Sequence, residues 1–138
     1  MAGSLFLDTN GWLALLNSAD ALHGEAAEAW ANLIRGRRRI DLTDWIVAET
    51  GNGMARARER SRLEEALERI LRSPRRELVI VDEPLLRQAL EFFGRQKDKN
   101  WGLVDCCSFL VMQDRGITDA FTSDRHFQQE GFRCLLTL

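Results

Sequence analysis

Short continuous apolar runs alternate along this chain with longer segments in which apolar residues recur every three or four positions. The first run, Leu5 to Leu7, leads straight into Asp8 and is typical of a buried strand in a parallel sheet. Similar runs predict further strands at residues 40–42, 77–81, 120–122 and 132–136. Helical spacing predicts helices at about residues 10–17, 22–33, 45–49, 61–71, 82–93 and 105–116.

Strands that alternate with pairs of helices predict an α/β fold in three layers. We expect a central, mainly parallel sheet of four to five strands, with helices on both faces and the first strand at its centre. A chain of 138 residues that is 45% hydrophobic fits one domain over residues 1–138.

Three positions carry signals for helix ends. Thr43 or Asp44 is expected to cap the third helix, and Ser61 the fourth. Gly36 follows the second helix, where a left-handed cap is common.

Composition adds limits on location and partners. The net charge of -2 gives no strong field for nucleic acid, although all basic residues except Lys97 and Lys99 are arginines, whose forks suit phosphate oxygens. The odd number of cysteines, 3, predicts no disulfide framework and fits a reducing cytoplasm. No apolar run approaches the roughly 20 residues that a transmembrane helix needs, so no membrane association is expected.

Four carboxylates stand near strand ends or in first turns of helices: Asp8, Glu49, Asp105 and Asp124. In an open parallel sheet, ligands bind beyond the carboxyl ends of the strands. Each acid also has a simpler interpretation as a helix cap or an exposed helix residue. The conjunction of four favours convergence at one edge.

Such a cluster needs protons or a cation, because two carboxylates about 4 Å apart repel by roughly 4 kcal/mol at an effective dielectric near 20. Oxygen-only ligands without His or Cys select hard divalent ions, and we expect Mg²⁺ or Mn²⁺. An ion of this kind binds phosphate oxygens and activates water. The pattern therefore indicates phosphodiester hydrolysis.

The text around the acids resembles the PIN-domain family of nucleases, and within it the bacterial toxin ribonucleases of the VapC type. The likeness extends over nearly the whole chain. The matching segments are Phe6–Asn10, Val47–Thr50, Leu103–Phe109, Ala120–Phe127 and Gly131–Phe132, and the most specific of them is Ala120–Phe127.

The resemblance implies a PIN fold and Mg²⁺- or Mn²⁺-dependent endonucleolytic cleavage of RNA. It makes Asp8 and Asp105 the main metal ligands, with Glu49 and Asp124 completing the pocket. It also implies a homodimer and a small antitoxin that neutralises the toxin, as in a type II toxin–antitoxin pair.

Supporting roles are expected for three polar residues. Thr122 would place a hydroxyl behind the acids, Ser108 could line the pocket one helical turn after Asp105, and Asn10 could bind substrate or a water. Phosphates of the RNA are expected near Arg37–Arg39, Arg56–Arg62 or Arg125, and the sequence alone leaves open which of these arginines bind them.

The two remaining candidates are interpreted as structural. His126 and His23 are expected to be parts of the fold rather than general bases. Trp101, beside Lys97 and Lys99, either stacks on a base or packs at the mouth of the pocket.

A second function class is a PIN-fold RNA-binding or regulatory protein that does not cleave; the intact set of four acids argues against it. A response-regulator receiver would need adjacent acids after its first strand and a lysine after a late strand, and this chain has neither. A haloacid-dehalogenase-like phosphatase would need an aspartate where Asn10 stands.

Overall fold

The computed structural model describes residues 3–137 and contains one parallel five-stranded sheet in the order β3-β2-β1-β4-β5. The expected α/β class, the parallel sheet and the central position of the first strand are confirmed. The strands are β1 (Leu5–Leu7), β2 (Ile40–Thr43), β3 (Arg76–Val79), β4 (Asp119–Phe121) and β5 (Arg133–Cys134).

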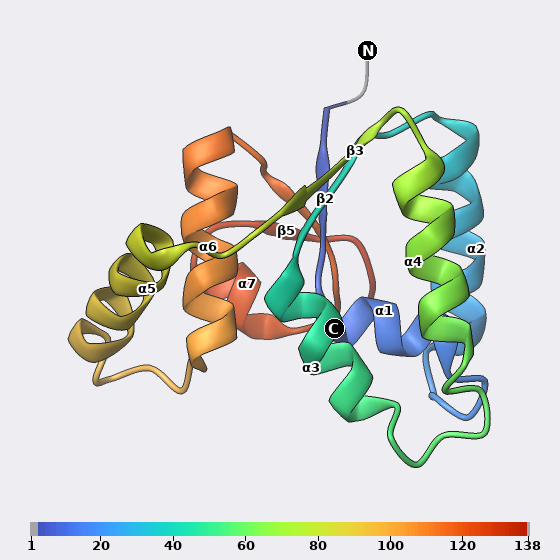
Figure 1. Ribbon diagram of the computed structural model, residues 1–138, viewed down its shortest axis with the longest axis horizontal. Coiled ribbons are helices and arrows are strands. Elements are labelled where there is room, and N and C mark those ends of the chain that lie inside the picture. Colours follow the sequence, from blue (N-terminus) through green and yellow to red (C-terminus); the bar gives the residue numbers. More distant parts are fainter. Residues whose placement is uncertain (1–2, 138) are drawn as a thin grey trace.

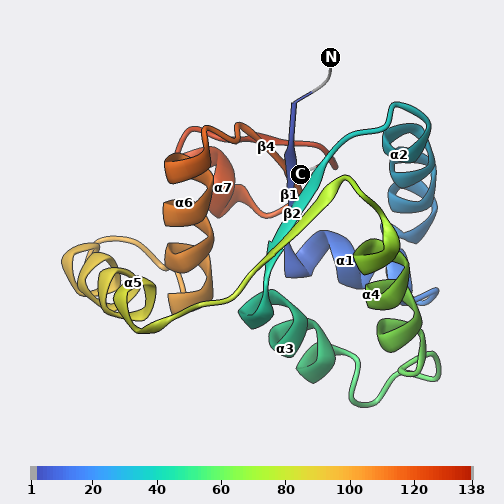
Figure 2. The ribbon, with the colours of Figure 1, turned by 45° about the horizontal axis from the view of Figure 1, so that its top comes forward.

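Helices cover both faces of the sheet, as Figures 1 and 2 show. Helices α1, α2 and α4 lie on one side, and α5, α6 and α7 on the other. Their bounds are α1 (Thr9–Leu16), α2 (His23–Arg35), α3 (Asp44–Gly53), α4 (Arg62–Arg72), α5 (Glu83–Arg95), α6 (Leu103–Arg115) and α7 (Arg125–Gln129). Helix α7 was not predicted, because five residues are too few to display a helical period.

Several helices begin at the same end of the sheet (Figure 1). Helices α1 and α3 begin directly after β1 and β2, and α7 begins shortly after β4. Helix α6 runs in the opposite direction to the strands, so its first turn also lies at their carboxyl ends. Backbone N–H groups and helix dipoles therefore favour anions at this end of the molecule.

Of the three predicted signals for helix ends, one is confirmed and two need correction. Thr43 caps α3 as expected, since its hydroxyl accepts a hydrogen bond from the Ile46 N–H at 3.2 Å. Ser61 precedes α4 but makes no capping hydrogen bond. Gly36 has φ -78°, and the left-handed residue is Arg37 at φ 55°, because the chain turns one residue later to let the Arg38 N–H reach the Leu33 carbonyl.

The third strand also ends earlier than its apolar run predicts. The run continues through Ile80 and Val81, but β3 stops at Val79 and Ile80 is 61% exposed. The Val81 N–H donates to the Asp44 carboxylate at 2.9 Å instead of to a strand. A side chain on α3 thus competes with the sheet for this donor.

The core lies on both faces of the central strands. Leu5, Phe6 and Leu7 of β1 are fully buried, as expected for a strand covered by helices on both sides. Trp12, Phe109 and Phe121 are the large side chains packed around it. Burial of the whole of β1 places the residue that follows it, Asp8, at the rim of the core.

Gly11 lets helix α1 approach β4 closely. A Cβ atom at this position would lie 2.0 Å from the backbone oxygen of Phe121. We expect Gly11→Ala to lower the free energy of unfolding by about 3 kcal/mol or more, because a backbone carbonyl cannot move aside as a side chain can. Urea denaturation measures the change.

Gly24 provides the matched control for that substitution. It lies in α2, and a Cβ there would meet nothing within 4 Å. Gly24→Ala should stabilise the protein by about 0.5–1 kcal/mol, since alanine is the better helix former. Equal effects of the two substitutions would contradict the close approach at Gly11.

Candidate functional site

Asp8 is the most deeply buried of the four predicted acids, with 3% of its surface exposed. It stands at the N-cap of α1 without forming a capping hydrogen bond, so the simpler interpretation of Asp8 as a cap does not hold. Its carboxylate instead accepts a hydrogen bond from the Thr122 hydroxyl at 2.8 Å. This contact joins residues that are 114 positions apart in the chain.

The surroundings of Asp8 disfavour its charge. The pKa of Asp8 is raised to about 8, mainly by burial, which the hydrogen bond from Thr122 opposes only in part. The charges of the other three carboxylates, those of Asp105, Asp124 and Glu49, contribute to the same increase. Residues from four separate elements therefore act on one another electrostatically, as the pattern of strand ends predicted.

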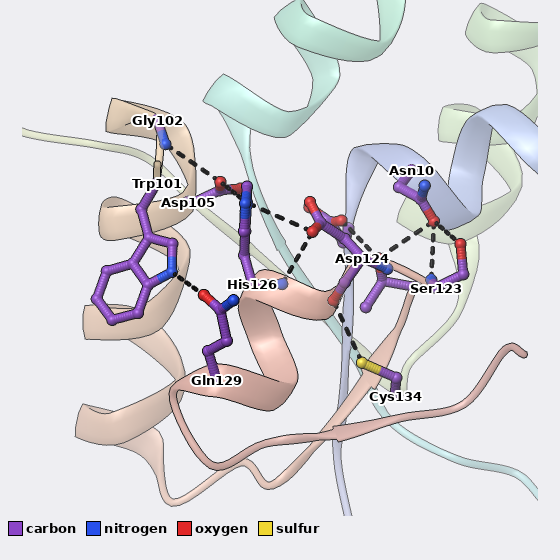
Figure 3. Close-up of polar contacts among 11 residues, drawn as sticks. Asn10, Trp101, Gly102, Asp105, Ser123, Asp124, His126, Gln129 and Cys134 are labelled. Carbon is purple, nitrogen blue, oxygen red and sulfur yellow. Dashed lines mark hydrogen bonds and ion pairs between the residues drawn. The ribbon is translucent and has the colours of Figure 1, made fainter. Parts of the chain in front are cut away.

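Asp105 and Asp124 face each other across an imidazole (Figure 3). The Nδ1 atom of His126 lies 3.2 Å from Asp105 Oδ2 and 3.4 Å from Asp124 Oδ1. Ligand atoms of these three residues all lie within 4.8 Å of one another. Burial and the charge of Asp124 raise the pKa of Asp105, while hydrogen bonds from Gly102 and His126 lower it.

Both of these acids also serve the simpler role of helix capping. Asp105, in the first turn of α6, accepts a hydrogen bond from the Gly102 N–H at 3.2 Å. Asp124, at the N-cap of α7, accepts one from the His126 N–H at 2.9 Å. Capping fixes the carboxylates in place, and oxygen lone pairs remain for a further ligand.

Glu49 reaches the site from α3 on the side of Asp8. Its Oε1 accepts a hydrogen bond from the Thr9 hydroxyl at 2.5 Å. Thr9 was not among the predicted site residues. The available signal was its position directly after Asp8, in the segment where β1 meets α1.

The predicted supporting residues lie around these acids to different degrees. The Thr122 hydroxyl, besides donating to Asp8, accepts from the Asp124 N–H at 3.0 Å. Asn10 is exposed, and its side-chain oxygen accepts from the N–H of Ser123 at 2.8 Å (Figure 3). Ser108 is fully buried, and its hydroxyl has no partner within residues 3–137. The functional roles of these side chains stay predictions.

Trp101 corrects one sequence-based alternative. Only 6% of it is exposed, its Nε1 donates to Gln129 at 3.0 Å, and its ring packs edge-on against Phe92 and Phe109. It is therefore part of the core and not a platform for a base. The polar loop that precedes it gave no sign of this burial.

Two of the predicted phosphate-binding arginines lie at the wrong end of the sheet. Arg38 binds the Gly3 carbonyl and Asp119, and Arg39 pairs with Asp41 and Glu77. Because β2 runs parallel to β1, the residues before β2 lie at the amino ends of the strands, away from Asp8. Arg125, by contrast, is exposed at the first position of α7, beside Asp124.

Comparison with known proteins agrees with this geometry. A family model described as "PIN domain" matches residues 5–132. The chain belongs to the PIN-domain family. Among curated PIN-domain relatives, the 23S rRNA-specific endonuclease VapC20 of two Mycobacterium tuberculosis strains is 33% identical over 130 residues, which cover 93% of this chain and 95% of the relative.

Solved structures show the same fold. The crystal structure of Mycobacterium tuberculosis VapC20, described as a toxin that cleaves the sarcin–ricin loop, superposes with a TM-score of 0.80 at 30% identity, over 94% of this chain and 96% of that one. VapBC2 from Rickettsia felis, bound to a DNA fragment from its promoter, gives a TM-score of 0.58 at 16% identity, over 94% and 95% of the two chains. The latter likeness concerns the fold alone.

Across residues 3–137, no helix of this PIN-domain protein is both long and apolar enough to cross a bilayer.

Proposed function

We propose that this protein is a metal-dependent endoribonuclease and the toxin of a type II toxin–antitoxin pair. One observation carries the proposal: Asp8, Glu49, Asp105 and Asp124 come from distant parts of the chain and converge at the carboxyl ends of the strands. The similarity to VapC20, an endonuclease by name, supports the same reaction class. The alternative of a PIN-fold protein that binds RNA without cleaving gives no reason for four mutually repelling acids.

The residues present fit a divalent cation. No lysine or arginine within residues 3–137 pairs with any of the four acids. The burial of Asp8 and the mutual repulsion of the carboxylates therefore lack a permanent positive partner of full charge. Asp8, Asp105 and Asp124 would hold Mg²⁺ or Mn²⁺, with Glu49 near them. The ion would supply Lewis-acid stabilisation of the phosphate and a more acidic water.

The chain's own residues hold this apparatus rigid. Thr122 orients Asp8 and, through its second contact, the start of α7. Thr9 orients the Glu49 carboxylate, which we propose positions the attacking water. Loss of such a hydrogen bond to a metal ligand typically lowers metal affinity or activity by about 10–100-fold. Arg125 is placed to contact a flanking phosphate.

We propose ribosomal RNA as the substrate class, on the strength of the printed specificity of VapC20. The decisive assay uses purified protein, free of any antitoxin, with intact ribosomes and with protein-free total RNA. Discrete fragments of the large ribosomal RNA should appear with Mn²⁺ or Mg²⁺ and vanish with EDTA. Binding to RNA with no cleavage under either metal would establish the alternative function.

We propose a docking place for a partner protein in the groove between α1, α2 and α4. A groove of about 1040 Å³ runs between α1, α2 and α4, and none of the four acids lines it. Its apolar wall includes Trp12, Ile34 and Ile70, while five arginines and one glutamate supply its charge. We propose that an amphipathic, acidic segment of the antitoxin binds there.

Ile34→Arg tests this docking place. Ile34 is 52% exposed and lines the groove, so the substitution should leave folding nearly unchanged and place an unfavourable charge against the partner. Co-purification with the protein encoded by the neighbouring reading frame should fall at least about tenfold, the effect of 1.4 kcal/mol. Ala31→Arg, on the exposed side of the same helix and outside the groove, should not alter it. Equal losses would rule the groove out.

We also propose a homodimer in the cytoplasm. Leu90 and Phe93 of α5 are 48% and 46% exposed, and we propose that this apolar face of α5 lies in the contact between the two copies. The three cysteines are free, as a reducing compartment requires. Sedimentation of the protein with and without Phe93→Glu tests the dimer.

A further inference from the structure

We propose that His126 is a direct nitrogen ligand of the divalent ion, so that one imidazole joins the carboxylates that would hold it. The inference rests on the proposed metal-dependent function, and it changes which ions the site prefers. It also reverses the sequence-based interpretation of His126 as a structural residue.

The separations between the ligand atoms carry the argument. Two ligands at about 2.1 Å from an ion and at right angles to each other lie roughly 3 Å apart. The Nδ1 atom of His126 is 3.2 Å from Asp105 Oδ2 and 3.4 Å from Asp124 Oδ1. Both nitrogen–oxygen separations are thus close to those of adjacent ligands of one ion, and the ligand atoms of all three residues lie within 4.8 Å of one another.

The backbone holds the imidazole in this position. The His126 N–H donates to Asp124 Oδ1, which ties the residue to the first turn of α7. The following residue, Phe127, is fully buried against Phe109 of α6, the helix that carries Asp105. The cap fixes the start of α7 and the aromatic contact packs α7 against α6, so that Nδ1 faces both carboxylates (Figure 3).

A hydrogen bond alone explains this arrangement less completely. A neutral imidazole carries one N–H and can satisfy one carboxylate well, whereas Nδ1 faces two at nearly equal distances. The buried Asp8, whose hydroxyl partner Thr122 also binds the Asp124 N–H, adds a third carboxylate next to them. A divalent ion with Nδ1 among its ligands would compensate all three acids at once.

A nitrogen ligand predicts selectivity among ions. Imidazole suits Mn²⁺ less than it suits later transition metals, but it suits Mg²⁺ least, since Mg²⁺ strongly prefers oxygen. Loss of the imidazole should therefore weaken the binding of Mn²⁺ more than the binding of Mg²⁺. A purely structural histidine would affect both ions equally.

The direct test is spectroscopic and uses the whole protein without RNA. Electron spin echo modulation of the Mn²⁺-loaded protein should show a coupled ¹⁴N nucleus, which changes to ¹⁵N when histidine is labelled. The chain has only 2 histidines, so His126→Gln should abolish the signal and His23→Gln, whose ring lies against the Ala14 carbonyl, should retain it. A wild-type protein that binds Mn²⁺ without histidine nitrogen modulation would overturn the proposal.

Calorimetric titration gives the second readout. His126→Gln should lower Mn²⁺ affinity by about 10-fold or more and Mg²⁺ affinity by much less. Equal reductions would count against direct ligation. Because neither measurement involves RNA, cleavage by a protein without the nitrogen signal would overturn this inference alone, and a nitrogen signal without cleavage of any RNA would overturn the nuclease function alone.

Discussion

Asp8→Asn should abolish metal-dependent RNA cleavage while the fold persists. The substitution removes one charged ligand from a site in which Asp8 is 3% exposed and surrounded by acids. The amide oxygen can still accept the hydrogen bond from Thr122, so the local structure is preserved. Activity should fall by more than about 100-fold, the upper range for loss of an outer partner of a metal ligand.

Cleavage of ribosomal RNA at saturating Mn²⁺ measures this effect, and circular dichroism reports the fold. Asp114→Asn is the matched control. Asp114 is exposed near the far end of α6, so this substitution makes the same chemical change away from the site. A folded Asp8→Asn protein with full Mg²⁺-dependent activity would refute the role proposed for Asp8.

The second large effect concerns stability and pH. In EDTA, the contribution of Asp8 to the free energy of unfolding should fall as pH rises from about 4 to about 8. The reason is that the pKa of Asp8 is about 8 in the folded protein and near its ordinary value of 3.8 in the unfolded chain. Between these values the folded state holds a proton that the unfolded state has released, so rising pH favours unfolding, by up to about 1.4 kcal/mol per pH unit.

Urea denaturation at several pH values, compared between wild type and Asp8→Asn, isolates this contribution. The variant should lose less stability over that range, because its amide does not titrate. The raised pKa of Asp105 acts in the same direction in both proteins, so some slope remains. Identical slopes for the two proteins would show that Asp8 ionises normally.

A divalent ion should reverse the effect at high pH. Binding to the folded state alone at 100 times the dissociation constant adds about 2.7 kcal/mol to its stability. The ion binds the ionised carboxylates, so the stabilisation by Mn²⁺ should be larger at pH 8 than at pH 5. Equal shifts in melting temperature at both pH values would place the ion elsewhere.

Much of this architecture follows from local patterns in the sequence. Three adjacent apolar residues, Leu5 to Leu7, predict a strand that is buried on both faces. Strands separated by helices predict a parallel sheet. The starts of α3 and α5 are likewise local, since Thr43 and Asp82 bind N–H groups three residues later. Signals within one turn or one strand can be interpreted without the fold.

The identity of the four acids also came from the sequence, but their mutual geometry did not. Which carboxylate is buried, and which hydroxyl binds it, depends on contacts such as that between Asp8 and Thr122 across 114 positions. Thr9 and His126 carried no local sign of their partners, Glu49 and Asp105, which lie 40 and 21 positions away.

The same reason explains the errors. Trp101 follows a polar loop, yet side chains of α5, α6 and α7 contact it. Arg38 and Arg39 bind Asp119 and Glu77, which lie 81 and 38 positions away in the chain. The sequence by itself determined the elements and the chemical types at the site, because these depend on neighbours along the chain. Only the tertiary structure decided the distances, the burial and the partners, because those depend on packing between segments that are remote in sequence.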